Sequence, residues 1–315
     1  MGKTQIVVLA LAVASVASAE PRYIGMVSAE GGFWVDSAGV LDHATVFEGS
    51  IVETTDAPAT VQIGSAARVV LDANSRAQVY ADHLFLERGR GQLDSGSNYR
   101  LEAHTLRVMP GSVGSRGVVA IGDSGAVEVG SLKGDLRVAN ADGVRVANVG
   151  AGNSVELRVE PGKDTSILTG CVARAGNAYL MRDEVSAVMV ELRGAAMTAQ
   201  TGQRVQVTGK VVTSEGAAVS ADQVVQAAQV KVLERGCGLA TGPAGSGSRA
   251  RVARMSRAPG AASGLRVSRR AMIAGIRVEP GSAEGAKAVT SRGDDESDNP
   301  DKPHKRHKPP ISPGR

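Results

Sequence analysis

The sequence predicts an all-β protein made of two successive β modules followed by a disordered C-terminal tail. Short runs of alternating apolar and polar residues recur from Tyr23 to Cys237, and turn residues separate them. No stretch between Tyr23 and Val159 has the spacing of a long amphipathic helix. After Cys237 the chain becomes rich in Gly, Ala, Ser, Arg and Pro, a composition that is typical of disorder.

The first residues have the layout of a secretory signal peptide. Lys3 precedes an apolar run from Ile6 to Val16, and the small residues Ala17-Ser18-Ala19 follow it. We expect cleavage between Ala19 and Glu20, which makes residues 1–19 the signal peptide. The alternative is an uncleaved anchor, but the run is shorter than the roughly 20 apolar residues that a spanning helix needs. The mature chain should therefore have no transmembrane segment and be periplasmic or extracellular, either soluble or peripheral to the envelope.

The first module, residues 20–162, is predicted to be a β-sandwich or roll. Asp142-Gly143 lies between two alternating runs, which is a strong signal for a hairpin. Gly122-Asp123-Ser124-Gly125 separates two further runs in the same way. The alternating pattern breaks at Glu160-Pro161-Gly162-Lys163, where we place the boundary between the modules.

The second module, residues 163–237, contains about five candidate strands. Gly209 interrupts one of them, as a glycine does at a bulge or at a sharp bend in a barrel. Five strands with one sharply bent suit a small OB-like β-barrel. The candidate strands are Ile167–Ala173, Ala178–Arg182, Ala187–Arg193, Arg204–Val212 and Gln226–Leu233.

The only two cysteines, Cys171 and Cys237, lie near the two ends of this second module. An exported protein folds in an oxidising compartment, which favours a disulfide between them. They lack C-x-x-C spacing and nearby histidines, which argues against a metal or redox role. Two separate thiols are the alternative. We expect the bridge to tie the first strand of the barrel to its exit.

Four motifs stand out in the first module: Phe47-Glu48-Gly49, Val70-Leu71-Asp72, a turn at Leu86-Glu87-Arg88-Gly89 and a late turn at Gly150-Ala151-Gly152. They resemble those of the exported FecR-like β domain over roughly residues 22–158. The resemblance implies the same β fold and supplies no catalytic residues. The second module is similar to small OB-like modules appended to exported bacterial proteins.

FecR-type regulators carry a membrane-spanning segment and a cytoplasmic arm that contacts a sigma factor. Only a signal peptide precedes the β domain here, so we do not expect that arm. The resemblance therefore leaves a second interpretation open, in which this chain senses an envelope signal and passes it to a membrane partner.

Catalytic and metal-binding motifs are weak in this sequence. Gly122-Asp123-Ser124-Gly125 is similar to the nucleophile segment of chymotrypsin-like proteases, with His43, His83 and His104 upstream, but no histidine stands in a catalytic context. A hairpin turn is the preferred interpretation. His304 and His307 form an H-x-x-H in a charged tail, for which solvation is the default. We therefore expect no enzyme activity, no catalytic residues, no metal and no cofactor.

Charge is distributed unevenly along the chain, and this distribution indicates which kinds of partner the protein could bind. Of 36 Lys/Arg and 32 Asp/Glu, 15 and 7 respectively follow Cys237, so the tail is suited to an anionic surface. Tyr179 is the only aromatic residue of the second module, which argues against nucleic acid as a partner.

The leading hypothesis is a non-enzymatic exported cell-envelope protein that binds or scaffolds an envelope protein or glycan through its β domains. The alternative is the envelope sensor described above.

Overall fold

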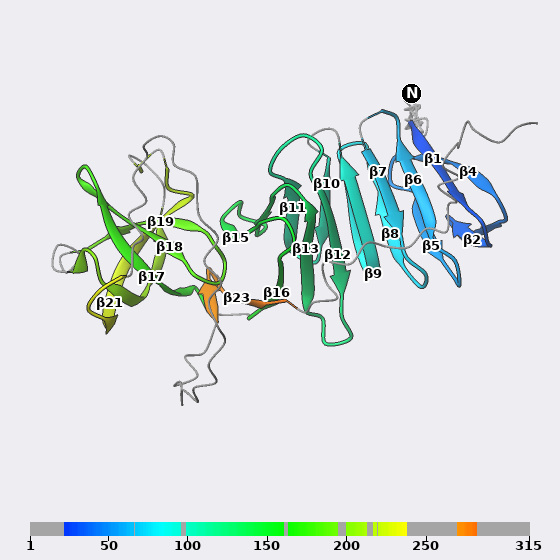
Figure 1. Cartoon of the computed structure of the whole chain (residues 1–315). Helices are drawn as coiled ribbons and strands as arrows, with labels where there is room; N and C mark the ends of the chain where they lie inside the picture. Colours follow the sequence, from blue (N-terminus) through cyan, green and yellow to red (C-terminus); the bar gives the residue numbers. More distant parts are fainter. Residues whose placement is uncertain are drawn as a thin grey trace, which may run out of the picture.

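The computed structural model describes residues 22–65, 67–95, 99–160, 163–194, 200–212, 217–218, 220–237 and 270–281. They form 23 β-strands and no α-helix, so the all-β prediction is confirmed for this part of the chain. Figure 1 shows a long two-layered sandwich, a separate barrel, and a strand pair between them. The predicted signal peptide with its cleavage site at Ala19 and Glu20, and the histidines His304 and His307, lie outside the described residues.

The sandwich consists of two sheets, which we call layer A and layer B. Strand pairs alternate between the layers as the chain proceeds, so both layers grow in the same direction (Figure 1). The spatial order in layer A is β4 (His43–Phe47), β1 (Tyr23–Ala29), β6 (Ala59–Ile63), β7 (Ala67–Leu71), β9 (His83–Ser95), β12 (Arg116–Ile121), β13 (Val127–Lys133) and β16 (Ser154–Val159). The order in layer B is β3 (Ala38–Val40), β2 (Phe33–Val35), β5 (Ile51–Thr54), β8 (Arg76–Val79), β9, β10 (Arg100–Ala103), β11 (Leu106–Pro110), β14 (Leu136–Ala139) and β15 (Arg145–Val149).

Period-two alternation explains this core. In β8, for example, Ala77 and Val79 are fully buried while Arg76 and Gln78 point outward. Each strand buries one face against the other layer, and the polar side chains form the outer faces. The two hairpins that the sequence predicts are present: β14 pairs with β15 across Asp142-Gly143, and β12 pairs with β13 across Gly122–Gly125.

Strand β9 belongs to both layers. Its first residues pair with β8 and β10 in layer B, and from Gly89 onward it pairs with β7 and β12 in layer A. Gly89 has a φ of 84°, and a Cβ at this position would collide with Ser75. The turn expected at Leu86–Gly89 is therefore wrong: the chain bends there inside one continuous strand, because glycine allows the backbone to pass from one layer to the other.

Five strands form a closed barrel: β17 (Thr165–Ala175), β18 (Ala178–Asp183), β19 (Met189–Arg193), β20 (Arg204–Val212) and β21 (Gln223–Glu234). Their pairings run β17–β18–β19–β21–β20 and return to β17, and the β19–β21 pair is parallel. The register shift between Thr208 and Gly209 confirms the bulge predicted at that glycine.

The prediction of a disordered segment at 238–315 is wrong for residues 270–281. These residues contain β22 (Ala271–Ile273) and β23 (Ile276–Pro280), a pair that we call the junction hairpin. β23 pairs with the sandwich strand β16 over five residues, and Met272 of β22 pairs with Ile167 of the barrel strand β17. The hairpin thus joins the two modules into one hydrogen-bonded network. Figure 1 shows its orange strands between the modules.

Burial explains why this short segment is ordered. Ala271, Ile273, Ile276 and Val278 are at most 3% exposed once the hairpin docks. The turn residues Ala274 and Gly275 both have positive φ, as in the tight two-residue turns that connect the strands of a hairpin. A two-stranded hairpin is marginal in water alone, so contact with both modules supplies its stability. The rest of 238–315 lies outside the described residues.

A polar contact also joins the sandwich to the barrel. Asp222, just before β21, accepts hydrogen bonds from Arg145 Nη1 at 2.6 Å and Asn148 Nδ2 at 2.9 Å, both on β15. The backbone N–H of Asn148 donates to the carbonyl of Ser186 at 2.7 Å. The edge strand of layer B is therefore held by the barrel and is not free.

Candidate binding face on layer B

The hairpin of β2 and β3 holds a half-exposed tryptophan, Trp34, at one end of layer B. Asp36 and Ser37 adopt positive φ in its turn, at 48° and 70°. The Asp36 carboxylate accepts hydrogen bonds from Ser50 Oγ and Ile51 N, each at 2.8 Å, which fixes the turn against β5. Trp34 lies between the buried residues Phe33 and Val35, so strand alternation directs its indole outward.

Trp34 is 47% exposed and lies flat over a glycine. It pairs with Gly39 across β2 and β3, and a Cβ at Gly39 would touch the indole at 3.6 Å. On the other side Trp34 pairs with Glu53 of β5. The indole thus has a fixed position on a rigid sheet, which limits the entropy that it would lose on contact with a ligand.

A row of ion pairs continues from Trp34 across layer B. Glu53 pairs with Arg76 Nη1 at 2.6 Å and also with Arg88, and Arg76 Nε pairs with Glu87 at 2.7 Å. The hydrogen bond from Arg76, with help from Arg88, lowers the pKa of Glu53 below its ordinary value. The hydrogen bonds to Glu87 and Glu53 raise the pKa of Arg76. The four side chains carry two positive and two negative charges, so the row is electrically balanced.

Trp34, Glu53 and Arg76 border a hollow of about 230 Å³ on the outer face of layer B. We call it the Trp34 hollow. It combines one aromatic face, one aliphatic side chain and three polar groups, so both apolar contacts and hydrogen bonds are available to a ligand. The lining residues are Trp34, Ser37, Ile51, Glu53 and Arg76.

A second polar cluster lies further along the same face. The rings of Tyr80 and His83 stack with centroids 4.4 Å apart and planes 8° apart. His83 Nδ1 lies 2.7 Å from Asp82, and Arg100 bonds to Asp82 at 2.8 Å and to Glu102 at 2.7 Å. The hydrogen bond with His83, and then that from Arg100, lowers the pKa of Asp82. Polar and aromatic groups therefore extend from the Trp34 hollow toward the middle of layer B.

The outer face of β18 and β19 in the barrel is covered. Glu191 of β19 is 7% exposed and accepts a hydrogen bond from the backbone N–H of Ala218 at 2.6 Å. This backbone bond, and then the Arg193 side chain, lowers the pKa of Glu191. Leu180 and Val224 on the same face are also buried. Because the chain before β21 lies against this face, the open face of layer B is the better candidate for ligands.

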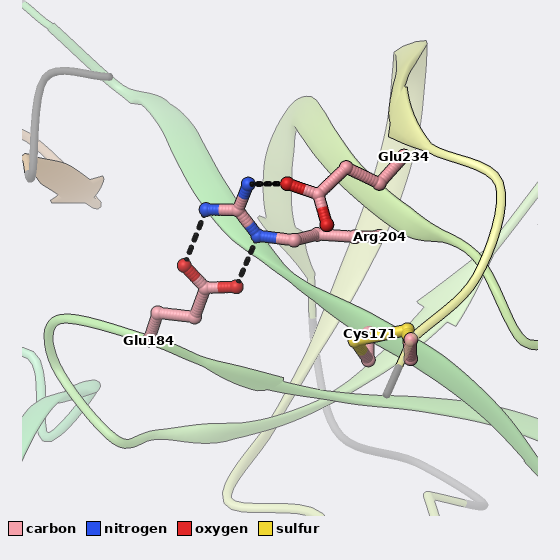
Figure 2. Close-up of a disulfide and its surroundings, with 5 residues drawn as sticks. Cys171, Glu184, Arg204 and Glu234 are labelled. Carbon is pink, nitrogen blue, oxygen red and sulfur yellow. Dashed lines mark hydrogen bonds and ion pairs between the residues drawn. A yellow bond between two sulfur atoms is a disulfide. The ribbon is translucent and has the colours of Figure 1, made fainter. Parts of the chain in front are cut away.

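The disulfide that the sequence predicts joins Cys171 to Cys237 in the structure, with Cα atoms 5.9 Å apart. It links β17 to the segment after β21, and the Cys237 N–H donates to Gly202 at 2.9 Å. Figure 2 shows Arg204 nearby, between two carboxylates. It donates to Glu184 from Nε and Nη2, at 2.6 and 2.7 Å, and to Glu234 at 3.0 Å, and these bonds raise its pKa.

Replacing both cysteines, Cys171→Ser with Cys237→Ser, should lower the free energy of unfolding of the barrel by about 2–4 kcal/mol. The bridge closes a loop of 66 residues and so restricts the unfolded chain. Hydrogen exchange of barrel peptides measures the effect, and reducing the wild type should reproduce it. Equal protection of the barrel peptides in the double variant and in the oxidised wild type would mean that the bridge contributes no stability. Emission of Trp34 in the sandwich serves as the internal control.

The other residues that the sequence singled out lie apart from one another. Ser124 forms the hairpin turn between β12 and β13, His43 contacts Asp42 at an exposed position, and His104 lies in the turn between β10 and β11 with a φ of 53°. Among the described residues no group of three or more His, Cys, Asp or Glu is placed to hold a metal ion. The same residues include no helix with the length and apolar character that a membrane crossing requires.

Sequence reasoning missed the Trp34 hollow, although one signal was available. The single tryptophan stands in "GFWVDS", between two apolar residues that alternation assigns to the core. An aromatic residue at the outward position of a strand is a candidate ligand contact. No family model, curated protein or solved structure matches this chain.

Proposed function

We propose that this protein is a non-enzymatic exported component of the cell envelope, which binds an envelope ligand through the outer face of layer B. The observation that carries the proposal is the half-exposed Trp34 held over a balanced ion-pair row on a rigid sheet. Holding the indole in a fixed position limits the entropy lost on binding. The signal peptide at 1–19 supports export.

The fold assignments belong to the same proposal. The barrel is an OB-like module, because its strands pair in the order first, second, third, fifth, fourth and close on the first. The sandwich is a FecR-like domain: Gly49 and Gly152, which carry the resemblance, have positive φ in turns between strands. In this view the outer face of layer B makes the specific attachment to the envelope, and the basic tail adds electrostatic attraction to anionic surfaces.

Replacing Trp34 with alanine should strongly weaken attachment to the envelope. The test uses the purified chain without residues 1–19, mixed with washed insoluble envelope material and sedimented. Wild type should sediment with the material, and Trp34→Ala should bind at least about 30-fold more weakly, as expected when a central aromatic contact is removed.

The matched control is Leu41→Ala, which removes a side chain that is 84% exposed in the turn between β3 and β4, outside the hollow. It should sediment like wild type. Sedimentation of Trp34→Ala at wild-type level, or no sedimentation of the wild type, would contradict the proposal.

A further inference from the structure

We propose that the Trp34 hollow binds an uncharged, hydroxyl-rich saccharide. This inference rests on the proposed function, since it names the ligand class of the same site. Three properties of the hollow support it: its charge balance, its flat aromatic wall and its continuation across the sheet.

Charge balance disfavours ionic ligands. Glu53 holds Arg76 through one carboxylate oxygen and Arg88 through the other. An anionic ligand would have to displace Glu53 from the two guanidinium groups, and a cationic ligand would have to displace both arginines from Glu53. A hydroxyl group has neither requirement, because it both donates and accepts. It can use the remaining lone pairs of Glu53 and the remaining N–H groups of Arg76 while the ion pairs stay intact.

The aromatic wall favours a ring with an apolar face. Trp34 presents its indole beside Ile51, while Ser37, Glu53 and Arg76 supply polar groups around them. A pyranose ring has C–H bonds on its faces and hydroxyl groups at its edge. It therefore matches an indole with a polar border better than an extended peptide does, since a peptide needs partners for its backbone N–H and C=O groups.

The outward side chains continue from the hollow toward β9. In the next register row Ile51 pairs with Gln78, and Gln78 pairs with Phe85, which is half-buried on the same face. β2 and β9 are three strand spacings apart, which puts Trp34 and Phe85 about 15 Å from each other. A saccharide of several units can reach both rings, whereas a single ring can reach only one.

The experiment uses Trp34 itself as the probe, because it is the only tryptophan in the chain. Envelope material that sediments the protein is partially hydrolysed, and anion exchange separates the released saccharides into a neutral and an acidic fraction. Wild-type emission should shift with the neutral fraction, and its oligomers should bind better than its monomers. Because no ion pair with the ligand forms, the affinity should stay within about twofold between about 0.05 and 0.5 M salt.

Glu53→Gln tests the charge argument. This variant leaves Arg76 and Arg88 without their shared carboxylate, so it should bind the neutral fraction about tenfold more weakly. It should also gain a salt-sensitive response to the acidic fraction, about tenfold stronger than that of wild type. Leu41→Ala should match wild type with both fractions.

The outcomes separate this inference from the proposed function. A wild-type response to the acidic fraction alone, or to neither fraction, would overturn the saccharide inference while Trp34-dependent sedimentation left the binding function standing. Absence of sedimentation would remove the binding function and the inference together. A neutral response that Glu53→Gln leaves unchanged would contradict the role of charge balance.

Discussion

Ending the chain after Arg269 is expected to uncouple the barrel from the sandwich. This truncation removes the junction hairpin, and with it the five-residue pairing to β16 and the contact of Met272 with β17. The buried side chains of Ile273, Ile276 and Val278 are lost, each worth about 1.5–3 kcal/mol, together with the smaller Ala271. The polar contacts of Asp222 with β15 remain, but hydrogen bonds to a charged group add about 1.5–3 kcal/mol each, so these two contribute less than the lost burial.

Calorimetry and solution scattering measure the uncoupling. The truncated chain should unfold in two separate transitions and occupy a wider range of shapes than the full chain. A chain ended after Gly281 is the matched control, because it loses residues 282–315 and keeps the hairpin. It should behave like the full chain. A single transition and unchanged scattering after truncation at Arg269 would show that the hairpin does not hold the modules together.

Replacing Asp183 with alanine should be the most damaging single change in the barrel. Its carboxylate is 1% exposed and accepts hydrogen bonds from the N–H groups of Thr169, Val185 and Ser186 and from the Ser186 hydroxyl, at 2.8–3.2 Å. Alanine would leave these buried donors without a partner. Each such group costs about 1–3 kcal/mol, so we expect a loss of at least about 3 kcal/mol.

Hydrogen exchange of β17–β19 peptides measures this loss, with sandwich peptides as internal reference. Ser186→Ala removes one donor to Asp183 and the long contact from Val188 N–H at 3.4 Å, and it should cost about 1 kcal/mol. Asp183→Asn should fall between the two variants, because its amide keeps one acceptor oxygen but turns an NH₂ group toward backbone donors. If the β17–β19 peptides were as well protected from exchange in Asp183→Ala as in Ser186→Ala, the carboxylate would not be the main stabilising group of this turn.

Local patterns predicted much of the fold. Alternation in segments such as "DLRVANADGVRVANV" fixes both the strands and the inward face, because one side of each strand must be buried. The crossing of β9 between the layers was not predictable in this way. A glycine at position 89 indicates an unusual backbone conformation. Whether the chain turns there or bends and continues as a strand depends on the packing of Ser75 against it, which the sequence does not show.

The junction hairpin was missed because composition was averaged over a long Gly-, Ala- and Arg-rich region. A repeat was available as a signal: "LRVEPG" at 157–162 recurs as "IRVEPG" at 276–281. The two copies lie antiparallel, with Leu157 opposite Val278 and Val159 opposite Ile276. The Trp34 hollow depends on three strands meeting in register, and no single stretch of sequence reveals that arrangement.

The position of the junction hairpin also sets an order of assembly. Residues 271–280 follow all five barrel strands along the chain, yet they complete layer A beside β16. Until they dock, β16 has an open side that other unfinished chains can pair with. The last strand to complete the sandwich therefore lies between the two modules, and a chaperone that shields β16 until the hairpin docks would protect the folding chain from aggregation.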